Sequence, residues 1–327
     1  MSYKLSIIIV NYNGKKFIKK CLESINLSEY KNYEIIIVDN ASQDNSIELV
    51  IPQNNIKIIK NKKNVGFSEA NNQAVKISKG DYLFFLNNDT KIKKDTISNI
   101  IIDIDKGKDI FIRTCKIFNY TGDLLFHSGI GVDVLGYPVN KGKMFYGEGS
   151  ALIIKKDIFL KIGGFDSSYF MFHEDIDLAW RAWLFGYQVK TVPNAIIYHY
   201  AGGSAGGRSS NKNKYQSTIL RRYFSERNNI KTLIKNYSLP FLFFILPLYL
   251  IINIFEMLLF LFFLKRKMVY YYIKAYSWNL INIKDTLIKR KYIQKNRVIS
   301  DFNIISKMYH GSGKLLMFKK IGLPQFK

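Results

Sequence analysis

Four short apolar runs lie within residues 1–90, and three of them end in small polar residues; this repeated pattern constrains the fold more than any other feature. The runs are Leu5–Val10, Glu34–Val38, Ile56–Ile59 and Tyr82–Leu86. Their continuous, largely β-branched character is typical of strands that are buried on both faces of a parallel sheet. Helical spacing separates the runs, over Lys16–Ile25, Asp44–Val50 and Gly66–Ser78. Strands that alternate with helices predict an α/β fold with a doubly wound, mostly parallel sheet.

Beyond Asp89 the chain keeps strand and helix patterns but loses the strict alternation. Strand-like runs lie at Ala151–Ile154, Val189–Val192 and Ala195–Tyr198, and a helical pattern covers Glu174–Phe185. The glycine-rich segment Gly202–Gly207 predicts a loop.

Polar clusters follow three of the apolar runs, at Asn11–Gly14, Asp39–Ser42 and Asn87–Thr90. Such residues are common in turns between strand and helix, and one cluster alone would need no other explanation. The carboxyl ends of parallel strands meet at one sheet edge, however, and open α/β sheets bind ligands there. The chain has neither a P-loop pattern nor G-x-G-x-x-G after the first strand, which excludes a P-loop NTPase and disfavours a dinucleotide site.

The net charge of +24 indicates an acidic partner, and its distribution indicates which one. Lys265–Lys327 carries 15 Lys and Arg against 2 Asp and Glu, a net of +13, so more than half of the excess lies in the last fifth of the chain. This basic stretch directly follows the most apolar segment of the sequence. We therefore expect attraction to an anionic membrane surface and no nucleic-acid partner.

The apolar segment Leu239–Leu264 has 22 apolar residues out of 26, and about 20 are enough to cross a bilayer. Two prolines, among them Pro247, interrupt it, and Tyr249, Asn253 and Glu256 share one helical face. Both flanks are basic, and the positive-inside rule places basic flanks in the cytoplasm. We therefore expect a broken, re-entrant or in-plane membrane segment. Tyr270–Ile283, rich in Tyr and Trp, predicts a second interfacial stretch.

The two cysteines, Cys21 and Cys115, lie far apart and fit no metal-ligand spacing. They exclude a disulfide framework and are compatible with a reducing compartment. The apolar run near the N-terminus is too short for a signal peptide, so we expect the start of the chain in the cytoplasm.

Six motifs resemble, in order, those of the family 2 glycosyltransferases, whose fold is called GT-A. They are SIIIVNYNG (6–14), IIIVDNASQDNS (35–46), NVGFSEANNQA (64–74), LFFLNNDT (83–90), GGFDSSYFMFHEDIDLAWRAWLFG (163–186) and YHYAGGS (198–204). The rhamnosyltransferase-like branch is the most similar, and the resemblance covers about residues 5–235. Each motif alone is weakly specific, whereas six in order are specific.

The resemblance implies a site for a nucleoside-diphosphate sugar. Asp39 matches the aspartate that accepts a hydrogen bond from the imide N–H of uracil or thymine, and Asn87, Asn88 and Asp89 occupy the family's D-x-D position. Asn87 departs from that pattern, because an amide stands where the family has a carboxylate. The residues that the resemblance places at the donor are Asn11, Asn13, Asp39, Asn64, Gly66, Phe67, Asn71, Asn87 and Asn88.

A divalent cation, Mn²⁺ or Mg²⁺, is the cofactor that the resemblance implies. Asp89 would bind it between the two donor phosphates, and His199 occupies a place where the family can supply a second ligand. Imidazole together with carboxylate suits Mn²⁺ better than Mg²⁺. Arg181 and Arg208 are additional candidates for contacting the phosphates.

Glu174 and Asp175 match the family's acceptor-activating pair, with Asp175 as the general base. Inversion at the sugar needs one base and no protein nucleophile. The simpler alternative is that these carboxylates stabilise a helix N-terminus. His173 is a candidate for the acceptor site, whereas Trp180 and Trp183 are expected in the core.

Together these features predict an inverting, metal-dependent glycosyltransferase. Residues 1–235 would form the GT-A domain and residues 236–327 a hydrophobic and basic membrane-associated region. The expected donor is dTDP-rhamnose or a UDP-sugar, and the expected acceptor a lipid-linked or cell-surface glycan at the cytoplasmic face of the membrane. Two alternatives remain open: transfer to polyprenyl phosphate itself, and a catalytically inactive membrane scaffold of the same fold, which the Asn87 departure motivates.

Overall fold

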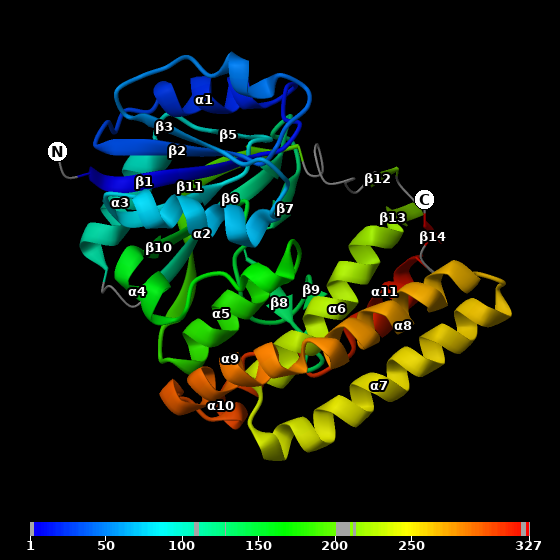
Figure 1. Ribbon diagram of the computed structural model, residues 1–327. Helices are drawn as coiled ribbons and strands as arrows, with labels where there is room; N and C mark the ends of the chain where they lie inside the picture. The colour runs from blue at the N-terminus through cyan, green and yellow to red at the C-terminus, as the bar shows by residue number, and fades with distance from the viewer. Residues whose placement is uncertain are drawn as a thin grey trace.

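A nine-stranded sheet forms the centre of the upper half of the protein in the computed structural model, which describes residues 3–107, 111–127, 129–200, 210–211, 214–321 and 325–326. Figure 1 shows the sheet above a group of long C-terminal helices. The strands in spatial order are β3 (Ile56–Lys60), β2 (Tyr33–Asp39), β1 (Tyr3–Asn11), β4 (Gly80–Leu86), β10 (Ala151–Lys155), β6 (Phe111–Asn119), β11 (Gln188–His199) and β5 (Thr90–Ile92), with β7 (Leu125–His127) beside β6.

The first four strands pair in parallel, as the alternation of strands and helices predicts. The later strands do not follow that rule. β10 inserts antiparallel between β4 and β6, β11 pairs in parallel with β6, and β5 and β7 pair antiparallel. The α/β fold class is thus confirmed, and the sheet is more mixed than the sequence indicated.

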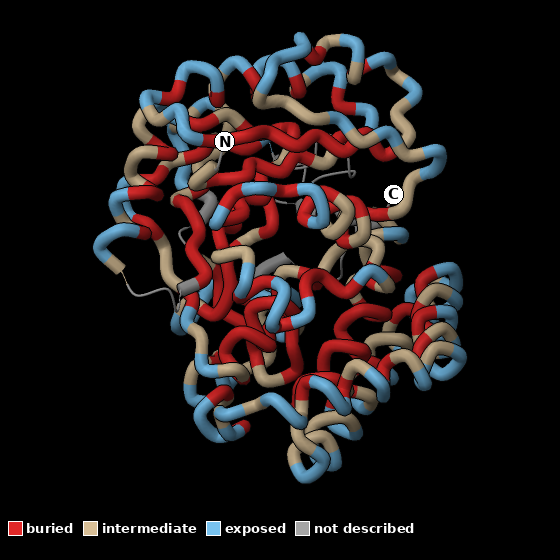
Figure 2. The backbone as a smooth tube through the Cα atoms, turned by 60° about the vertical axis from the view of Figure 1, so that its left-hand side comes forward, coloured by how far each residue is buried: buried red, intermediate tan, exposed pale blue. Residues whose placement is uncertain are grey.

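Each central strand is buried on both faces because its alternate residues enter two separate cores. In β1, Ile8 joins one core, and Ile7 and Ile9 join the other. Helices α1 (Ile18–Asn26) and α3 (Thr96–Lys106) cover the second face. Helices α2 (Phe67–Ile77), α4 (Lys156–Lys161) and α5 (Glu174–Leu184) cover the first face. Figure 2 shows the resulting buried layer through the strands.

Two local predictions differ from the structure. The runs Val189–Val192 and Ala195–Tyr198 form one strand, β11, whose register shifts between Val192 and Ile196. The helix expected after Asp44 is a single 3₁₀ turn, η1 (Ser46–Leu49). Asp44 accepts a hydrogen bond from the Ser46 N–H at 3.0 Å in the turn before η1, whose N-cap residue is Asn45.

The C-terminal helices share a core with the sheet domain. They are α6 (Ile219–Asn236), α7 (Leu239–Phe262), α8 (Arg266–Ile281), α9 (Ile283–Asn296), α10 (Asp301–Ile305) and α11 (Gly313–Ile321). Leu233 of α6 and Ile293 of α9 belong to the same buried cluster as the strand residue Ile8. Helix α7 is continuous with Pro247 inside it, so of the expected broken, re-entrant and in-plane arrangements the broken one is wrong.

Minor elements complete the described chain. They are η2 (Ser167–Tyr169), β8 (Gly131–Val132), β9 (Pro138–Val139), β12 (Ser210–Asn211), β13 (Lys214–Ser217) and β14 (Gln325–Phe326).

Buried charges connect α5 to α6 and α9. Asp177 of α5 accepts hydrogen bonds from Lys235, at 3.0 Å, and from Arg181, at 2.9 Å. Asp166 accepts from Lys235 at 2.8 Å and from Lys289 at 2.6 Å. Despite burial, these cations hold the pKa of both carboxyl groups below the ordinary value. The charges are therefore paired, and removing one partner would leave the other buried without compensation.

We expect Asp177→Ala to lower the free energy of unfolding by about 3–5 kcal/mol, because Lys235 and Arg181 would lose a buried counter-charge. Urea denaturation at neutral pH measures this difference. The exposed residue Asp81 supplies the control, and Asp81→Ala should change stability by no more than about 0.5 kcal/mol. Equal stability of the two variants would contradict the structural role of Asp177.

Candidate active site

The polar residues that follow β1, β2 and β4 meet at one edge of the sheet. Asn11 pairs in register with Asp39, and both are buried. The Asn11 side-chain amide donates to Ser46 Oγ at 2.8 Å and, more weakly, to Asp39 Oδ1 at 3.4 Å. Its amide oxygen accepts from Asn88 at 2.8 Å. One buried asparagine thus connects the three polar clusters.

The next polar layer orders the loop before α2. The Asn40 side chain donates to Asn64 Oδ1 at 2.8 Å and accepts from the Val65 N–H at 3.0 Å. Asn64 Oδ1 also accepts from the Gly66 N–H at 2.9 Å. The sequence did not single out Asn40, although its place directly after Asp39 at a strand end was a usable signal.

Asn71, Asn13 and Asn87 each make a hydrogen bond with a backbone group near this edge of the sheet. Asn71, in α2, donates to the Phe67 carbonyl at 2.8 Å. Asn13 accepts from the Gln43 N–H at 2.8 Å, which ties the loop after β1 to the loop after β2. The Asn87 N–H donates to the Ser150 carbonyl at 3.2 Å, next to the end of β4.

Asp89 and His199 lie in direct contact. Residues Thr90 and His199 pair in β5 and β11, and this places His199 Nε2 3.0 Å from Asp89 Oδ1. Burial lowers the pKa of His199, but the hydrogen bond and charge of Asp89 outweigh it and raise the pKa above its ordinary value. Glu148 Oε2 lies 3.9 Å from His199 Nδ1. The sequence did not identify Glu148, because its proximity depends on the insertion of β10 into the sheet.

The residue types of this pair fit a divalent cation. A carboxylate and an imidazole are suitable ligands for Mn²⁺, and metals at phosphate-transfer sites commonly take remaining ligands from the substrate phosphates. Within the described part of the chain there is no group of three or more His, Cys, Asp or Glu arranged to hold a metal ion. Asp89 and His199 are in contact and have the ligand types that such a cation prefers.

The acidic pair at the start of α5 lies beside Glu148. Asp175 Oδ2 accepts from the Gly149 N–H at 3.3 Å. Burial, followed by the charge of Glu148, raises the pKa of Asp175 to about 6. Burial, followed by the charge of Asp175, raises the pKa of Glu174 to about 8. Burial and repulsion between neighbouring carboxylates therefore raise the pKa of both carboxyl groups, and the two titrate as a coupled pair.

The loop before the acidic pair is strained and is clamped from α6. Phe170, Phe172 and His173 have φ of 63°, 67° and 68°, a region that is unfavourable for residues with a Cβ. Arg227 donates to the Tyr169 carbonyl at 2.7 Å, and Asn228 donates to the Phe172 carbonyl at 2.7 Å. Asn228 also donates to the carbonyls of Tyr169 and Met171. These hydrogen bonds hold the backbone in a conformation that it would not adopt by itself.

Three neighbouring expectations have different outcomes. Arg181, a candidate for phosphate contact, is buried and forms an ion pair with Asp177. Its guanidinium therefore serves the interior of the protein and does not face a ligand. Trp180 and Trp183 are buried in the core as expected. Arg208 and the loop Gly202–Gly207 lie outside the described residues.

His173 is buried behind the acidic pair. Burial lowers its pKa to about 4, so the imidazole is neutral at physiological pH. Its Nδ1 atom has no hydrogen-bond partner among the described residues. A neutral, buried His173 does not provide a cation for an acceptor.

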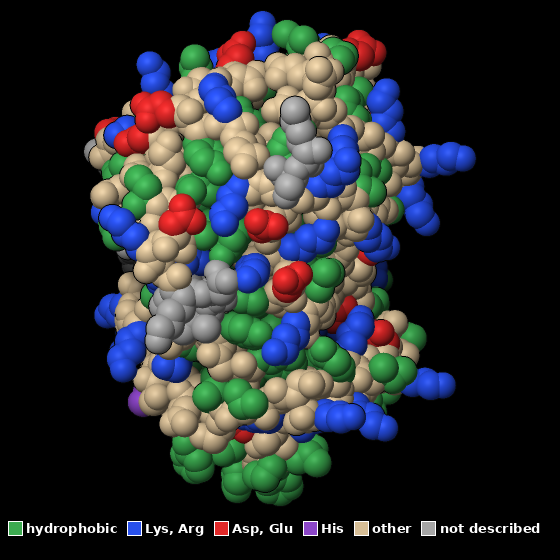
Figure 3. Space-filling view, turned by 90° about the vertical axis from the view of Figure 1, so that its left-hand side faces the viewer, with side chains coloured by type: hydrophobic (Ala, Val, Ile, Leu, Met, Phe, Trp, Pro, Cys, Tyr) green, Lys and Arg blue, Asp and Glu red, His purple; other side chains and the backbone are tan. Residues whose placement is uncertain are grey.

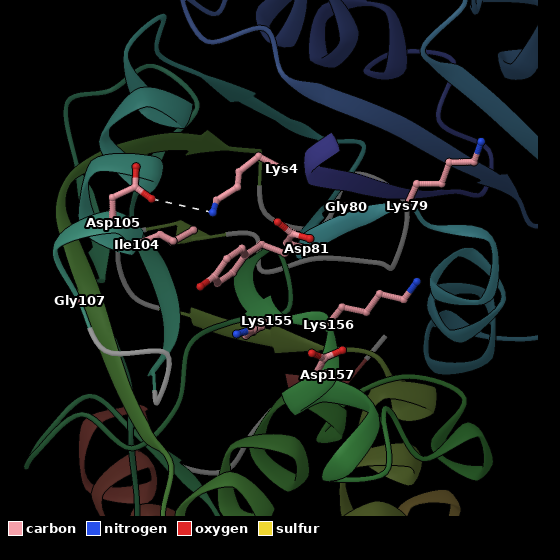
Figure 4. Close-up of a pocket in the computed structure, with 11 residues that line it drawn as sticks. Lys4, Lys79, Gly80, Asp81, Ile104, Asp105, Gly107, Lys155, Lys156 and Asp157 are labelled. Atoms are coloured by element: carbon pink, nitrogen blue, oxygen red, sulfur yellow. Dashed lines mark ion pairs between the residues drawn. The ribbon is translucent and has the colours of Figure 1, made fainter. Parts of the chain in front are cut away.

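A separate solvent-open hollow of about 670 Å³ lies at the opposite edge, where β1 and β4 begin (Figure 4). Its lining includes four lysines and three aspartates, so the charges largely balance. These are Lys4, Lys79, Lys155, Lys156, Asp81, Asp105 and Asp157. None of the residues predicted for the donor, the metal or the acceptor lines this hollow.

The sheet, its polar edge and the acidic pair define a GT-A-type transferase, and the chain belongs to glycosyl transferase family 2, whose sequence profile matches residues 6–176. Rhamnosyltransferase WbbL from Escherichia coli is 28% identical over 254 residues, which are 68% of this chain and 95% of that protein. An uncharacterized glycosyltransferase from Haemophilus influenzae is 30% identical over 175 residues, 50% of this chain and 57% of its own length.

Solved structures show the same fold at low sequence identity. The mannosyltransferase PcManGT from Pyrobaculum calidifontis, in complex with GDP-Man and Mn²⁺, has a TM-score of 0.54 at 14% identity. The alignment covers 90% of this chain and 87% of that one. GalNAc-T7 with UDP, GalNAc and Mn²⁺ has a TM-score of 0.59 at 15% identity, covering 73% of this chain and 49% of the other.

Gly66 is a position where the site requires glycine. Its φ is +87°, and a Cβ there would lie 2.5 Å from the Phe170 carbonyl oxygen. We expect Gly66→Ala to lower the free energy of unfolding by ~1–2 kcal/mol through backbone strain. The overlap of the new Cβ with the Phe170 carbonyl oxygen should lower it by a further ~1–3 kcal/mol. Gly163→Ala is the matched control, because Gly163 has φ +90° but 3.8 Å of clearance. Chemical denaturation of both variants measures the difference, and equal losses would show that the overlap is relieved.

Proposed function

We propose that the protein is an inverting, metal-dependent glycosyltransferase whose donor is a nucleoside-diphosphate sugar, with dTDP-rhamnose or a UDP-sugar as the first candidates. The observation that carries the proposal is the series of contacts that runs from the strand ends to the acidic pair. It joins Asp89 to His199, brings His199 near Glu148, and brings the Glu148–Gly149 segment to Asp175. A donor site and an acceptor base are thus adjacent in one polar region.

The proposed roles follow from the chemistry of each side chain. Asp39 would accept a hydrogen bond from the pyrimidine base, and Asp89 with His199 would hold the cation. When bound, the cation neutralises charge that develops on the diphosphate. The acceptor oxygen attacks the anomeric carbon, the bond to the diphosphate oxygen breaks, and the hydroxyl proton passes to Asp175. The raised pKa of Glu174 lowers the negative charge that the pair carries near neutral pH.

The acceptor is proposed as a lipid-linked or cell-surface glycan at the cytoplasmic membrane face. Three features support this choice: the similarity to a rhamnosyltransferase, the apolar helix α7 and the basic tail. Residues 1–235 would carry the transfer chemistry, and residues 236–327 would bring it to the membrane. If bare polyprenyl phosphate alone serves as acceptor, the alternative acceptor is correct and the donor site is unchanged.

We expect one of UDP, dTDP and GDP to raise the melting temperature in the presence of Mn²⁺. Saturation at 100 times Kd stabilises by ~2.7 kcal/mol, which corresponds to ~4 °C in a protein of 327 residues. Differential scanning fluorimetry with and without Mn²⁺ provides the measurement. Asp89→Ala should abolish the Mn²⁺-dependent part, and Asp81→Ala should retain it.

The nucleotide that produces the shift identifies the donor class. An Asp89→Ala variant that responds like the unmodified protein would remove Asp89 from the metal site. The absence of any shift with all three nucleotides would favour the inactive scaffold.

Turnover is expected to fall below about pH 6, because Asp175 must be ionised to accept a proton and its pKa lies near that value. Asp175→Asn should reduce kcat by ~10²–10⁴-fold while nucleotide binding is retained. Glu148→Gln removes a charge that raises the pKa of Asp175, so it should shift the acid limb to lower pH. Asp81→Asn is the distant control, and an identical shift there would rule out a local effect of Glu148.

A further inference from the structure

The described residues concentrate their exposed large apolar side chains in the C-terminal helices. Of 36 such side chains, 25 follow residue 238. Figure 3 shows apolar side chains gathered at the lower end of the molecule, which is where Figure 1 places the start of α7. Helix α7 is the one described helix that is long and apolar enough to cross a membrane, and only 11% of its most apolar window is buried.

The two sides of α7 differ sharply. Phe244, Ile251, Phe255 and Phe262 recur with helical spacing on one side and are 73%, 63%, 62% and 79% exposed. The opposite side carries Tyr249, Asn253, Glu256 and Phe260, which face the protein: Tyr249, Asn253 and Phe260 are fully buried. One side of α7 therefore packs against the protein, and the opposite side is exposed.

Polar contacts fix the inner side of α7 to α6, to α11 and to Tyr137, which directly precedes β9. Glu256 accepts from Arg222 at 2.6 Å and from Lys314 at 2.5 Å. Tyr249 donates to Glu226 at 2.7 Å, and Asn253 donates to the Tyr137 hydroxyl at 3.3 Å. A helix that crossed a bilayer would have to break these contacts and would leave Glu256, Arg222 and Lys314 without their partners.

Both ends of α7 are also held on the protein. The Ser238 N–H donates to Asp301 of α10 at 3.0 Å, and Phe241 packs edge-on against Phe302 at 4.9 Å. At the other end, Phe260 belongs to a buried cluster with Met268 and Tyr272 of α8. Neither end is free to move to the far side of a membrane while the fold persists.

The other C-terminal helices carry exposed basic side chains. Exposed lysines and arginines lie on α8, α9 and α11, at Arg266, Lys267, Lys274, Lys284, Lys291, Lys295 and Lys319. Their charge complements an anionic phospholipid surface. A second copy of this chain would instead place like charges against one another.

We propose that α7 lies in the plane of one membrane leaflet, with its Phe244–Phe262 side in the lipid, its Tyr249–Glu256 side on the protein, and both flanks in the same aqueous compartment. The inference rests on the proposed action at a membrane. It adds a fixed orientation, because α6, which contacts the catalytic loop, also contacts the inner side of α7 through Arg222 and Glu226.

Impermeant maleimide labelling distinguishes the arrangements, since Cys21 and Cys115 are fully buried and an introduced surface thiol will be the reactive one. The full chain carrying Ser238→Cys, Phe255→Cys or Arg266→Cys is added to preformed vesicles of phosphatidylcholine and phosphatidylglycerol. We expect Ser238→Cys and Arg266→Cys to be labelled from outside and Phe255→Cys to be protected only when vesicles are present. Protection of one flank would overturn the proposal in favour of a span.

Flotation with the same vesicles measures affinity. Phe244→Glu with Phe255→Glu should weaken binding by roughly tenfold or more, whereas Leu27→Glu with Ile51→Glu, equally exposed apolar positions on the sheet domain, should not. Protection of Phe255→Cys without vesicles, together with a dimer in light scattering, would overturn the proposal in favour of a second copy. The nucleotide-dependent melting shift tests the proposed function separately, because the four positions substituted by Glu lie outside the proposed donor site.

Discussion

The buried pairing of two carboxylates with lysines of the C-terminal helices is the interaction on which the arrangement of this protein depends. Asp166 and Asp177 flank the strained loop and the acidic pair, and Lys235 of α6 contacts both. Ion pairs of this kind add little net stability compared with apolar packing, but they are very costly to separate. They therefore specify where α6 sits rather than how stable the protein is. The position of α6 in turn decides where the backbone before Glu174 is held.

Helix α6 also contacts both the loop before the acidic pair and the apolar helix α7. One side of α6 presents Arg227 and Asn228 to the carbonyl groups of the loop, and another presents Arg222 and Glu226 to the inner side of α7. A buried polar network is stable only when its members are all satisfied, and here the donors and acceptors come from distant parts of the chain. The sheet domain and the apolar helix are consequently one mechanical unit.

Local patterns sufficed to predict the first four strands, because burial on both faces leaves an apolar run in β1, β2 and β4, and the partly exposed edge strand β3 still has three isoleucines. They did not suffice for Glu148, whose place beside His199 arises from the antiparallel insertion of β10, a long-range pairing with no local signature. Arg181 was misassigned because a charged residue near an acidic motif has the same appearance in sequence whether it faces a ligand or Asp177. Pro247 was taken as a break, although a helix tolerates proline when the freed carbonyl is satisfied elsewhere.

The hydrogen bonds from Arg227 and Asn228 have a consequence for how this family can recombine. The matched family segment ends at residue 176, yet the donors that stabilise its last loop lie more than fifty residues further along the chain. A hybrid that joined this segment to a C-terminal half without hydrogen-bond donors at the positions of Arg227 and Asn228 would keep Phe170, Phe172 and His173 in their unfavourable conformation without compensation. Catalytic segment and following helix are therefore expected to be inherited together, and the smallest exchangeable module extends through α6.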